Sequence, residues 1–207
     1  MKDKIIEAHV LELFPQIVSM FKVETKLNSK QLKLINKYSE DCYKNDGNTT
    51  STNSFILNLP AFKNLKKELL KRVELHCYGI LKINKKVKPF ITQSWLNYTQ
   101  QNQFHHQHAH PNSFLSGAYY ISCDNNDSIH FFNLNYNQIE PVCDTYTRYN
   151  SSQWTHSTNT HDLFIFKSGL SHSVKMKPNN ATRISLAFNV FLKGEIGTAR
   201  HLTYLKV

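Results

Sequence analysis

The sequence is poor in the features that mark fibrous, membrane-spanning and disulfide-rich proteins. Its 207 residues contain only 6 Gly and 6 Pro, too few for a collagen-like or low-complexity chain. No apolar run approaches the roughly 20 residues that a membrane-spanning helix needs, and the charged N-terminus lacks the apolar core of a signal peptide. The sequence therefore predicts a protein without a membrane partner, located in the cytoplasm, or in the host cytoplasm if it is viral.

Cysteine content and charge set bounds on redox state and partners. The 4 cysteines lie far apart and none forms a C-x-x-C pair, which disfavours a zinc ribbon or a thioredoxin-like site. The 25 Lys and Arg residues outnumber the 15 Asp and Glu residues, and this excess allows a nucleic acid as a partner. Because the lysines are spread without a dense basic block, compositional bias is the favoured explanation. The oligomeric state stays open, a homodimer included.

The hydrophobic pattern of the first part of the chain predicts few regular elements. Apolar and β-branched residues indicate an opening strand, and apolar residues at helical spacing indicate two helices separated by a polar loop. The expected ranges are 10–23 for the strand, 28–43 and 62–82 for the helices, and 44–54 for the loop.

From Pro89 onward, short strand-like runs alternate with Gly, Asn, Asp and Ser. Only the polar and aromatic stretch 133–162 is hard to assign. It could be a long loop or two irregular strands. This order predicts a mainly β protein with N-terminal helices, a jelly roll whose helices pack on one outer face. We expect one integrated domain, in which 1–88 supports a core formed by 89–207.

A run of histidines in 103–113, QFHHQHAHPNS, is the first chemical landmark. Alternate side chains of an extended chain share a face, so His106, His108 and His110 would lie together and His105 would point away. Imidazoles spaced about 6–7 Å along a strand suit two positions on one metal ion. Taken alone, this H-x-H pattern has an alternative explanation to a metal site, which is a surface tract or a stack of core histidines.

The second landmark combines a later histidine with an arginine. His172 follows a strand and a turn, and Arg183 comes 11 residues later in the strand-like run TRISLAFNV. On that strand Arg183 and Ser185 would share one face, opposite an apolar face that the helices could cover. An inward-facing arginine needs an anion, and a carboxylate fits its guanidinium fork. Either a ligand or a structural Asp or Glu could supply that carboxylate.

Together these motifs resemble those of the Fe(II)/2-oxoglutarate-dependent oxygenases, and most of all a branch found in bacteria and phages. The matching elements, in chain order, are Trp95-Leu96-Asn97, His108-Ala109-His110-Pro111-Asn112-Ser113, Ser116-Gly117-Ala118-Tyr119-Tyr120, Gly169 to Val174, and Arg183 to Asn189. The resemblance implies a double-stranded β-helix, which is a variant of the jelly roll. It also implies a hydroxylase that uses Fe(II), 2-oxoglutarate and O₂, acts on an unknown prime substrate, and releases succinate and CO₂.

The same resemblance implies a role for particular residues. His108, His110 and His172 would bind the metal, with His110 where most of the superfamily has Asp or Glu. A neutral histidine there keeps the geometry but removes a negative charge, which weakens Fe(II) binding. Arg183 would bind the distal carboxylate of 2-oxoglutarate. The residues implied to line the same pocket are Ser185, Tyr120 and Asn97. His106 would support the ligands, and the histidines expected on the surface or in packing are His76, His105, His130, His156, His161 and His201.

Three alternatives stay open at the level of sequence. His110 and Asn112 could be the near pair of ligands in place of His108 and His110, although Pro111 argues against this by breaking the strand between them. A cupin-type metal protein also uses H-x-H, but it usually has a Glu a few residues later, and none follows here until Glu140. A non-catalytic phage or nucleic-acid-associated protein that retains the fold is the third, because the carboxylate ligand is missing.

Overall fold

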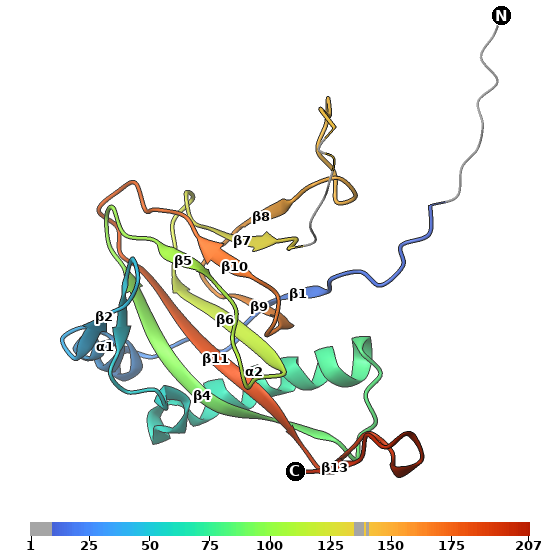
Figure 1. The fold of residues 1–207 in the computed structure, drawn as a ribbon. Coiled ribbons are helices and arrows are strands. Elements are labelled where there is room, and N and C mark those ends of the chain that lie inside the picture. The colour runs from blue at the N-terminus through green and yellow to red at the C-terminus, as the bar shows by residue number, and fades with distance from the viewer. Residues whose placement is uncertain (1–9, 135–138, 140) are drawn as a thin grey trace, which may run out of the picture.

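The computed structural model describes residues 10–134, 139 and 141–207. Within these residues, a seven-stranded antiparallel sheet packs against a four-stranded antiparallel sheet (Figure 1). The strand order is β1-β9-β6-β11-β4-β3-β2 in the large sheet and β5-β10-β7-β8 in the small sheet. This arrangement is the double-stranded β-helix that the sequence predicts, with helices on one outer face.

The elements have the following bounds. The large sheet contains β1 (Val18–Lys22), β9 (Asp162–Lys167), β6 (Leu115–Ser122), β11 (Arg183–Lys193), β4 (Lys88–Thr99), β3 (Thr49–Ser51) and β2 (Cys42–Lys44). The small sheet contains β5 (His105–His108), β10 (His172–Val174), β7 (Ser128–Phe132) and β8 (Gln153–Ser157). The helices are α1 (Ser29–Tyr38), α2 (Lys63–Glu74), the π-helix η3 (Leu75–Ile80), and the short 3-10 helices η1 (Ile56–Asn58), η2 (Pro60–Phe62) and η4 (Ala199–His201). A hairpin of β12 (Glu195–Ile196) and β13 (Leu205–Lys206) lies near the C-terminus.

The first predicted helix forms, but it is shorter than expected. It begins with a capping box, in which the Asn28 side chain accepts the Gln31 N–H (3.0 Å) and the Gln31 side chain accepts the Asn28 N–H (2.8 Å). It ends at Tyr38, and residues that were expected to be helix or loop form the β2–β3 hairpin instead. The prediction of a loop over 44–54 is thus wrong at β3, whose Thr residues pair with β4 and extend the large sheet.

The other expectations for the helices and the ends of the chain hold to different degrees. The helix predicted over 62–82 is α2, which continues into η3. The predicted opening strand is confined to β1, within 10–23. The unassigned stretch 133–162 contributes the exposed strand β8 and the first residue of β9 among its described residues, with 135–138 and 140 outside them. Among the described residues, no helix is long and apolar enough to cross a membrane.

Two apolar clusters hold the layers together. The first lies between the helices and the outer face of the large sheet, where Leu65 and Leu69 of α2 pack with Leu186 and Phe188 of β11. Figure 1 shows α2 on the side of this sheet that faces away from the small sheet. The second cluster lies between the two sheets, and its buried residues are Tyr120, Ile129, Phe131, Phe164 and Phe166. Alternation along β11 therefore directs its apolar residues to the helices and turns Arg183 and Ser185 to the interior between the sheets.

A close approach of β6 to β11 requires glycine at position 117. Gly117 is the cross-strand partner of Phe188. A Cβ atom on Gly117 would lie 2.1 Å from Cζ of the Phe188 ring. The ring therefore occupies the space that any side chain at 117 would need.

Gly117→Ala should lower the free energy of unfolding by about 1–3 kcal/mol, because the added methyl group overpacks the core. Urea unfolding followed by circular dichroism measures this change. Gly169→Ala is the matched control, since a Cβ at Gly169 would meet no atom within 4 Å. Equal stability of the two variants would contradict the packing described here.

Candidate metal centre

The pairing of two short strands brings together histidines from distant parts of the chain. His108 of β5 and His172 of β10 are direct cross-strand partners. His110 lies two residues beyond the end of β5, where its backbone N–H donates to the Ser168 carbonyl (2.9 Å). The ligand nitrogens of His108, His110 and His172 all lie within 4.8 Å of one another. The structure thus gathers the three histidines that the sequence singled out.

Backbone carbonyls fix the orientation of two of these rings. Nδ1 of His108 donates to the His106 carbonyl (2.8 Å), and Nδ1 of His172 donates to the Leu170 carbonyl (3.0 Å). A neutral imidazole that carries its proton on Nδ1 has its lone pair on Nε2. Hydrogen bonds of this kind orient the histidine ligands of metal ions. Both rings are therefore held with Nε2 free for a ligand role.

The third ring lies at a spacing that suits a shared cation. Nε2 of His110 is 3.4 Å from Nε2 of His172. For metal–nitrogen bonds of roughly 2.1 Å, two nitrogens at a tetrahedral angle lie roughly 3.4 Å apart. Since the His172 Nε2 carries a lone pair, it can accept a hydrogen bond from Nε2–H of His110, or share a metal ion with His110 when that ring carries its proton on Nδ1. The donor set of three imidazoles fits Fe, Zn, Ni or Cu, and this group contains no carboxylate.

Burial keeps these imidazoles neutral. It lowers the pKa of His110 to about 4 and the pKa of His172 to about 3, and the neighbouring histidines add to both shifts. Burial also lowers the pKa of His108, against the hydrogen bond to the His106 carbonyl. A neutral imidazole binds a metal ion without first losing a proton, so the site is ready for metal at neutral pH.

A bulge in β5 changes the predicted faces of the histidine strand. His172 and Val174 of β10 pair with His108 and His105, so two steps on one strand oppose three on the other. The prediction that His105 points away from the site is therefore wrong. Its ring stacks on that of His108, with centroids 4.4 Å apart. The alternation of side chains in the sequence assumes regular strand pairing, so it could not predict this bulge.

The remaining histidines lie outside this cluster, as predicted. Nδ1 of His76 is 2.7 Å from the Ser19 hydroxyl, and Nδ1 of His161 is 3.0 Å from the Tyr119 hydroxyl. His130 hydrogen-bonds Ser128 and Thr155, while His156 and His201 are exposed.

The predicted cosubstrate residues form a row across three adjacent strands. Ser185 of β11 has Asn97 of β4 and Tyr120 of β6 as its cross-strand partners. Arg183 lies two residues before Ser185 on the same face. Burial raises the pKa of the Tyr120 hydroxyl, and the nearby Arg183 charge opposes this rise. The Asn97 side-chain carbonyl accepts a hydrogen bond from Thr50 (3.0 Å), so the scaffold already uses that atom.

Arg183 belongs to a buried charge network; the sequence allowed a structural Asp or Glu as its partner but did not identify the members. Its Nη1 donates to Asp127 (2.9 Å), and Lys177 contacts both Asp127 (3.1 Å) and Asp124 (2.7 Å). The Lys177 side chain is fully buried, and that of Asp127 is 1% exposed. Nη2 of Arg183 is also buried and has no hydrogen-bond partner among the described residues. A structural carboxylate thus takes one terminal nitrogen of the guanidinium and leaves the other free.

The alternative ligand Asn112 is not gathered with these groups. It lies in an exposed turn beyond the histidine strand, with a left-handed backbone (φ 54). The turn begins at Pro111, where the sequence predicts that the strand is broken. The geometry thus favours His108 over Asn112 as the partner of His110.

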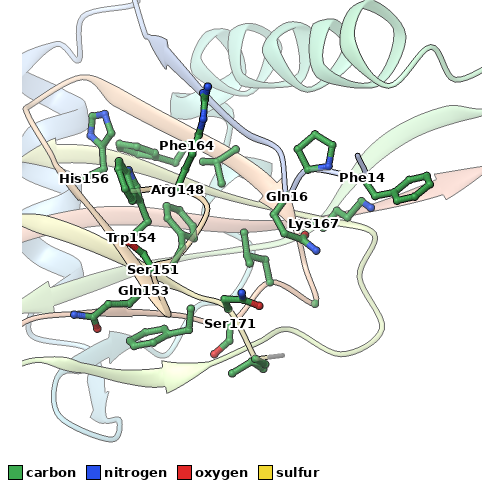
Figure 2. Close-up of a pocket in the computed structure, with 18 of the residues that line it drawn as sticks. Phe14, Gln16, Arg148, Ser151, Gln153, Trp154, His156, Phe164, Lys167 and Ser171 are labelled. Atoms are coloured by element: carbon green, nitrogen blue, oxygen red, sulfur yellow. The ribbon is translucent and has the colours of Figure 1, made fainter. Parts of the chain in front are cut away.

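A large cavity lies beside the histidine cluster, although the three histidines do not line it. It has a volume of about 1220 Å³ and reaches Ser171, the residue before His172. Figure 2 shows Trp154 and His156 of β8 on one side of it. Phe14 and Lys167 lie on the opposite side. The cavity combines aromatic walls with a few polar groups, as ligand sites commonly do.

The fold and the site define a class of protein, the jelly-roll proteins with histidines gathered on neighbouring strands of one sheet. Residues 93–189 match the sequence model of a family described as "Putative 2OG-Fe(II) oxygenase", in which 2OG is 2-oxoglutarate. The matched segment contains His108, His110, His172 and Arg183. A comparison with curated proteins finds no match.

Solved structures of such enzymes share the fold. A prolyl-4-hydroxylase from Pseudomonas putida has a TM-score of 0.56 and 11% identity, over 84% of this chain and 92% of that chain. HygX from Streptomyces hygroscopicus, solved with nickel, 2-oxoglutarate and hygromycin B, has a TM-score of 0.56 and 10% identity, over 84% and 82% of the two chains. The epimerase SnoN from nogalamycin biosynthesis has a TM-score of 0.63 and 7% identity, over 85% and 76%.

Lys177→Ala should destabilise the protein by about 3–5 kcal/mol, because it leaves a buried carboxylate without one of its two cationic partners. Chemical denaturation measures the change. The matched control is Lys175→Ala, which removes an exposed lysine two residues away on the same segment. If the two variants were equally stable, Lys177 would not balance a buried charge.

Stability should also fall at acid pH through Asp124. The hydrogen bond from Lys177 is the main cause that lowers the pKa of Asp124 from 3.8 to about 2. A lowered pKa stabilises the fold above pH 3.8, and this contribution is lost as the pH falls toward 2. As the pH falls across this range, the free energy of unfolding should decrease less in Asp124→Asn than in the wild type. Parallel curves would contradict the assignment.

Proposed function

We propose that this protein is an Fe(II)- and 2-oxoglutarate-dependent hydroxylase in which His108, His110 and His172 hold the metal. The observation that carries the proposal is the convergence of the three ring nitrogens, two of them oriented by backbone carbonyls. Bound Fe(II) would supply the activation of O₂ that couples oxidation of 2-oxoglutarate to succinate and CO₂ with hydroxylation of a C–H bond.

Aromatic side chains flank two of the three histidines. The Phe166 ring lies 4.7 Å from the His172 ring, and Phe131 lies 6.5 Å from it. On the other side, the Trp95 ring lies 5.7 Å from the His110 ring. A site with these walls strengthens electrostatic interactions and excludes competing reactions with water.

Arg183 would anchor the distal carboxylate of 2-oxoglutarate through Nη2. That atom is the unpaired donor of a network in which two cations, Arg183 and Lys177, already balance two carboxylates. The hydroxyls of Ser185 and Tyr120 are on the same interior face and would complete the carboxylate site, with the Asn97 amide beside them. Because Asp127 holds Nη1, Arg183 would meet the cosubstrate with one nitrogen rather than with the whole fork.

We also infer a cytoplasmic location and an acidic or polyanionic prime substrate. All four cysteines are free thiols, which suits a reducing compartment. The net charge of +10 favours a negatively charged partner, a nucleic acid included. The cavity beside His172 offers room for part of such a substrate, with Arg148 and Lys167 on its walls.

His108→Ala and His172→Ala should each lose the tight equivalent of Fe(II), because each leaves two of the three ligands. Anaerobic metal titration measures the loss. The wild type should gain about 2.7 kcal/mol of stability at a hundredfold excess of metal over Kd, and neither variant should gain as much. Asn112→Ala is the control and should bind metal normally. Tight binding by His108→Ala together with loss of binding by Asn112→Ala would move the site two residues along the chain.

Arg183→Lys should weaken 2-oxoglutarate binding by about 1.5–3 kcal/mol, because the lysine loses the nitrogen that would face the cosubstrate. Isothermal titration with the metal present measures the affinity. Metal affinity without 2-oxoglutarate should stay as in the wild type. Unchanged 2-oxoglutarate affinity would remove Arg183 from the site.

A further inference from the structure

A second histidine group lies next to the proposed metal site, toward solvent. It consists of His105, His106 and His108, whose ligand nitrogens all lie within 4.8 Å of one another. The bulge in β5 creates the group, because it turns His105 to the same side as His108. Among the described residues, His108 belongs to both groups of potential metal ligands.

The rings of this outer group are also prepared to bind a cation. Nδ1 of His106 donates to the Asp46 carbonyl (3.1 Å), so the lone pair of the neutral ring is on Nε2. The Asp46 carboxylate lies 3.9 Å from the same Nδ1 and adds negative charge beside the group. The His106 side chain is 32% exposed, whereas His172 of the inner group is 7% exposed. A metal ion from solvent therefore meets the outer group first.

We propose that His105, His106 and His108 form an outer position for a divalent transition-metal ion that loads the inner site. The ion passes inward when His110 and His172 replace His105 and His106, while His108 remains a ligand throughout. Each position offers three neutral imidazoles, so the number of protein ligands and the oxidation state of the ion are unchanged by the transfer. The outer position needs neither 2-oxoglutarate nor turnover, but the transfer rests on the inner site of the proposed function.

Co(II) titration of the double variant His110→Ala/His172→Ala tests the outer position, with the visible absorption of Co(II) and equilibrium dialysis as readouts. We expect one equivalent to remain bound, roughly 10- to 100-fold more weakly than in the wild type. Further replacement of His105 and His106 by Ala should abolish this binding. The matched control, His156→Ala/His201→Ala, removes two exposed histidines outside the cluster and should bind as the wild type does.

The outcomes separate the outer position from the inner one. If His110→Ala/His172→Ala bound no more Co(II) than the variant without four histidines, the outer position would be overturned and the inner site would stand. If it bound Co(II) as tightly as the wild type, the proposed inner site would be wrong. Stopped-flow loading of Co(II) into His105→Ala/His106→Ala gives a second test that keeps the inner ligands. Loading should slow by about tenfold with one equivalent still bound at the end, and a wild-type rate would overturn the loading role.

Discussion

The pairing of β5 with β10 is the constraint on which the site depends. It sets His108 directly opposite His172, and the end of β5 then allows His110 to approach from the adjoining turn. The two carbonyls that orient the rings belong to His106 and Leu170, each two residues before the ring that it holds. Each ring is therefore oriented by its own segment of backbone, while the register of the two strands brings the rings together, and a slip of one residue would separate them.

The large sheet supplies the support for this pairing. Its central strand, β11, places apolar side chains against the helices and polar side chains between the sheets, so one strand serves both the core and the site. Asp127, which holds Arg183, lies immediately before β7, the neighbour of β10. The buried network thereby connects the two sheets close to the proposed cosubstrate site. Its cost in desolvation is offset by the close pairing of Lys177 and Arg183 with the two carboxylates.

Much of this arrangement follows from the sequence, and the rest depends on contacts between distant residues. The alternation in TRISLAFNV predicts correctly which side chains of β11 meet the helices, and the order of the histidine and arginine motifs predicts the family whose sequence model residues 93–189 match. The bulge at His105 could not be predicted, because alternation assumes regular pairing. The ion pair between Asp127 and Arg183 could not be predicted either. The number of residues that separate Asp127 from Arg183 does not show that their two segments meet in the fold. The hydrogen bond between Thr50 and Asn97 could not be predicted for the same reason, because the sequence of the β2–β3 hairpin is polar and indicates a loop.

The central claim is that three neutral histidines hold Fe(II) in a site that also takes 2-oxoglutarate. Its most direct test is the visible absorption of the anaerobic protein after Fe(II) and then 2-oxoglutarate are added. The account predicts a weak charge-transfer band that appears only when both are present, as expected for 2-oxoglutarate chelated to the bound metal. A spectrum that stays the same as that of the protein with Fe(II) alone, at concentrations where both bind, would contradict it.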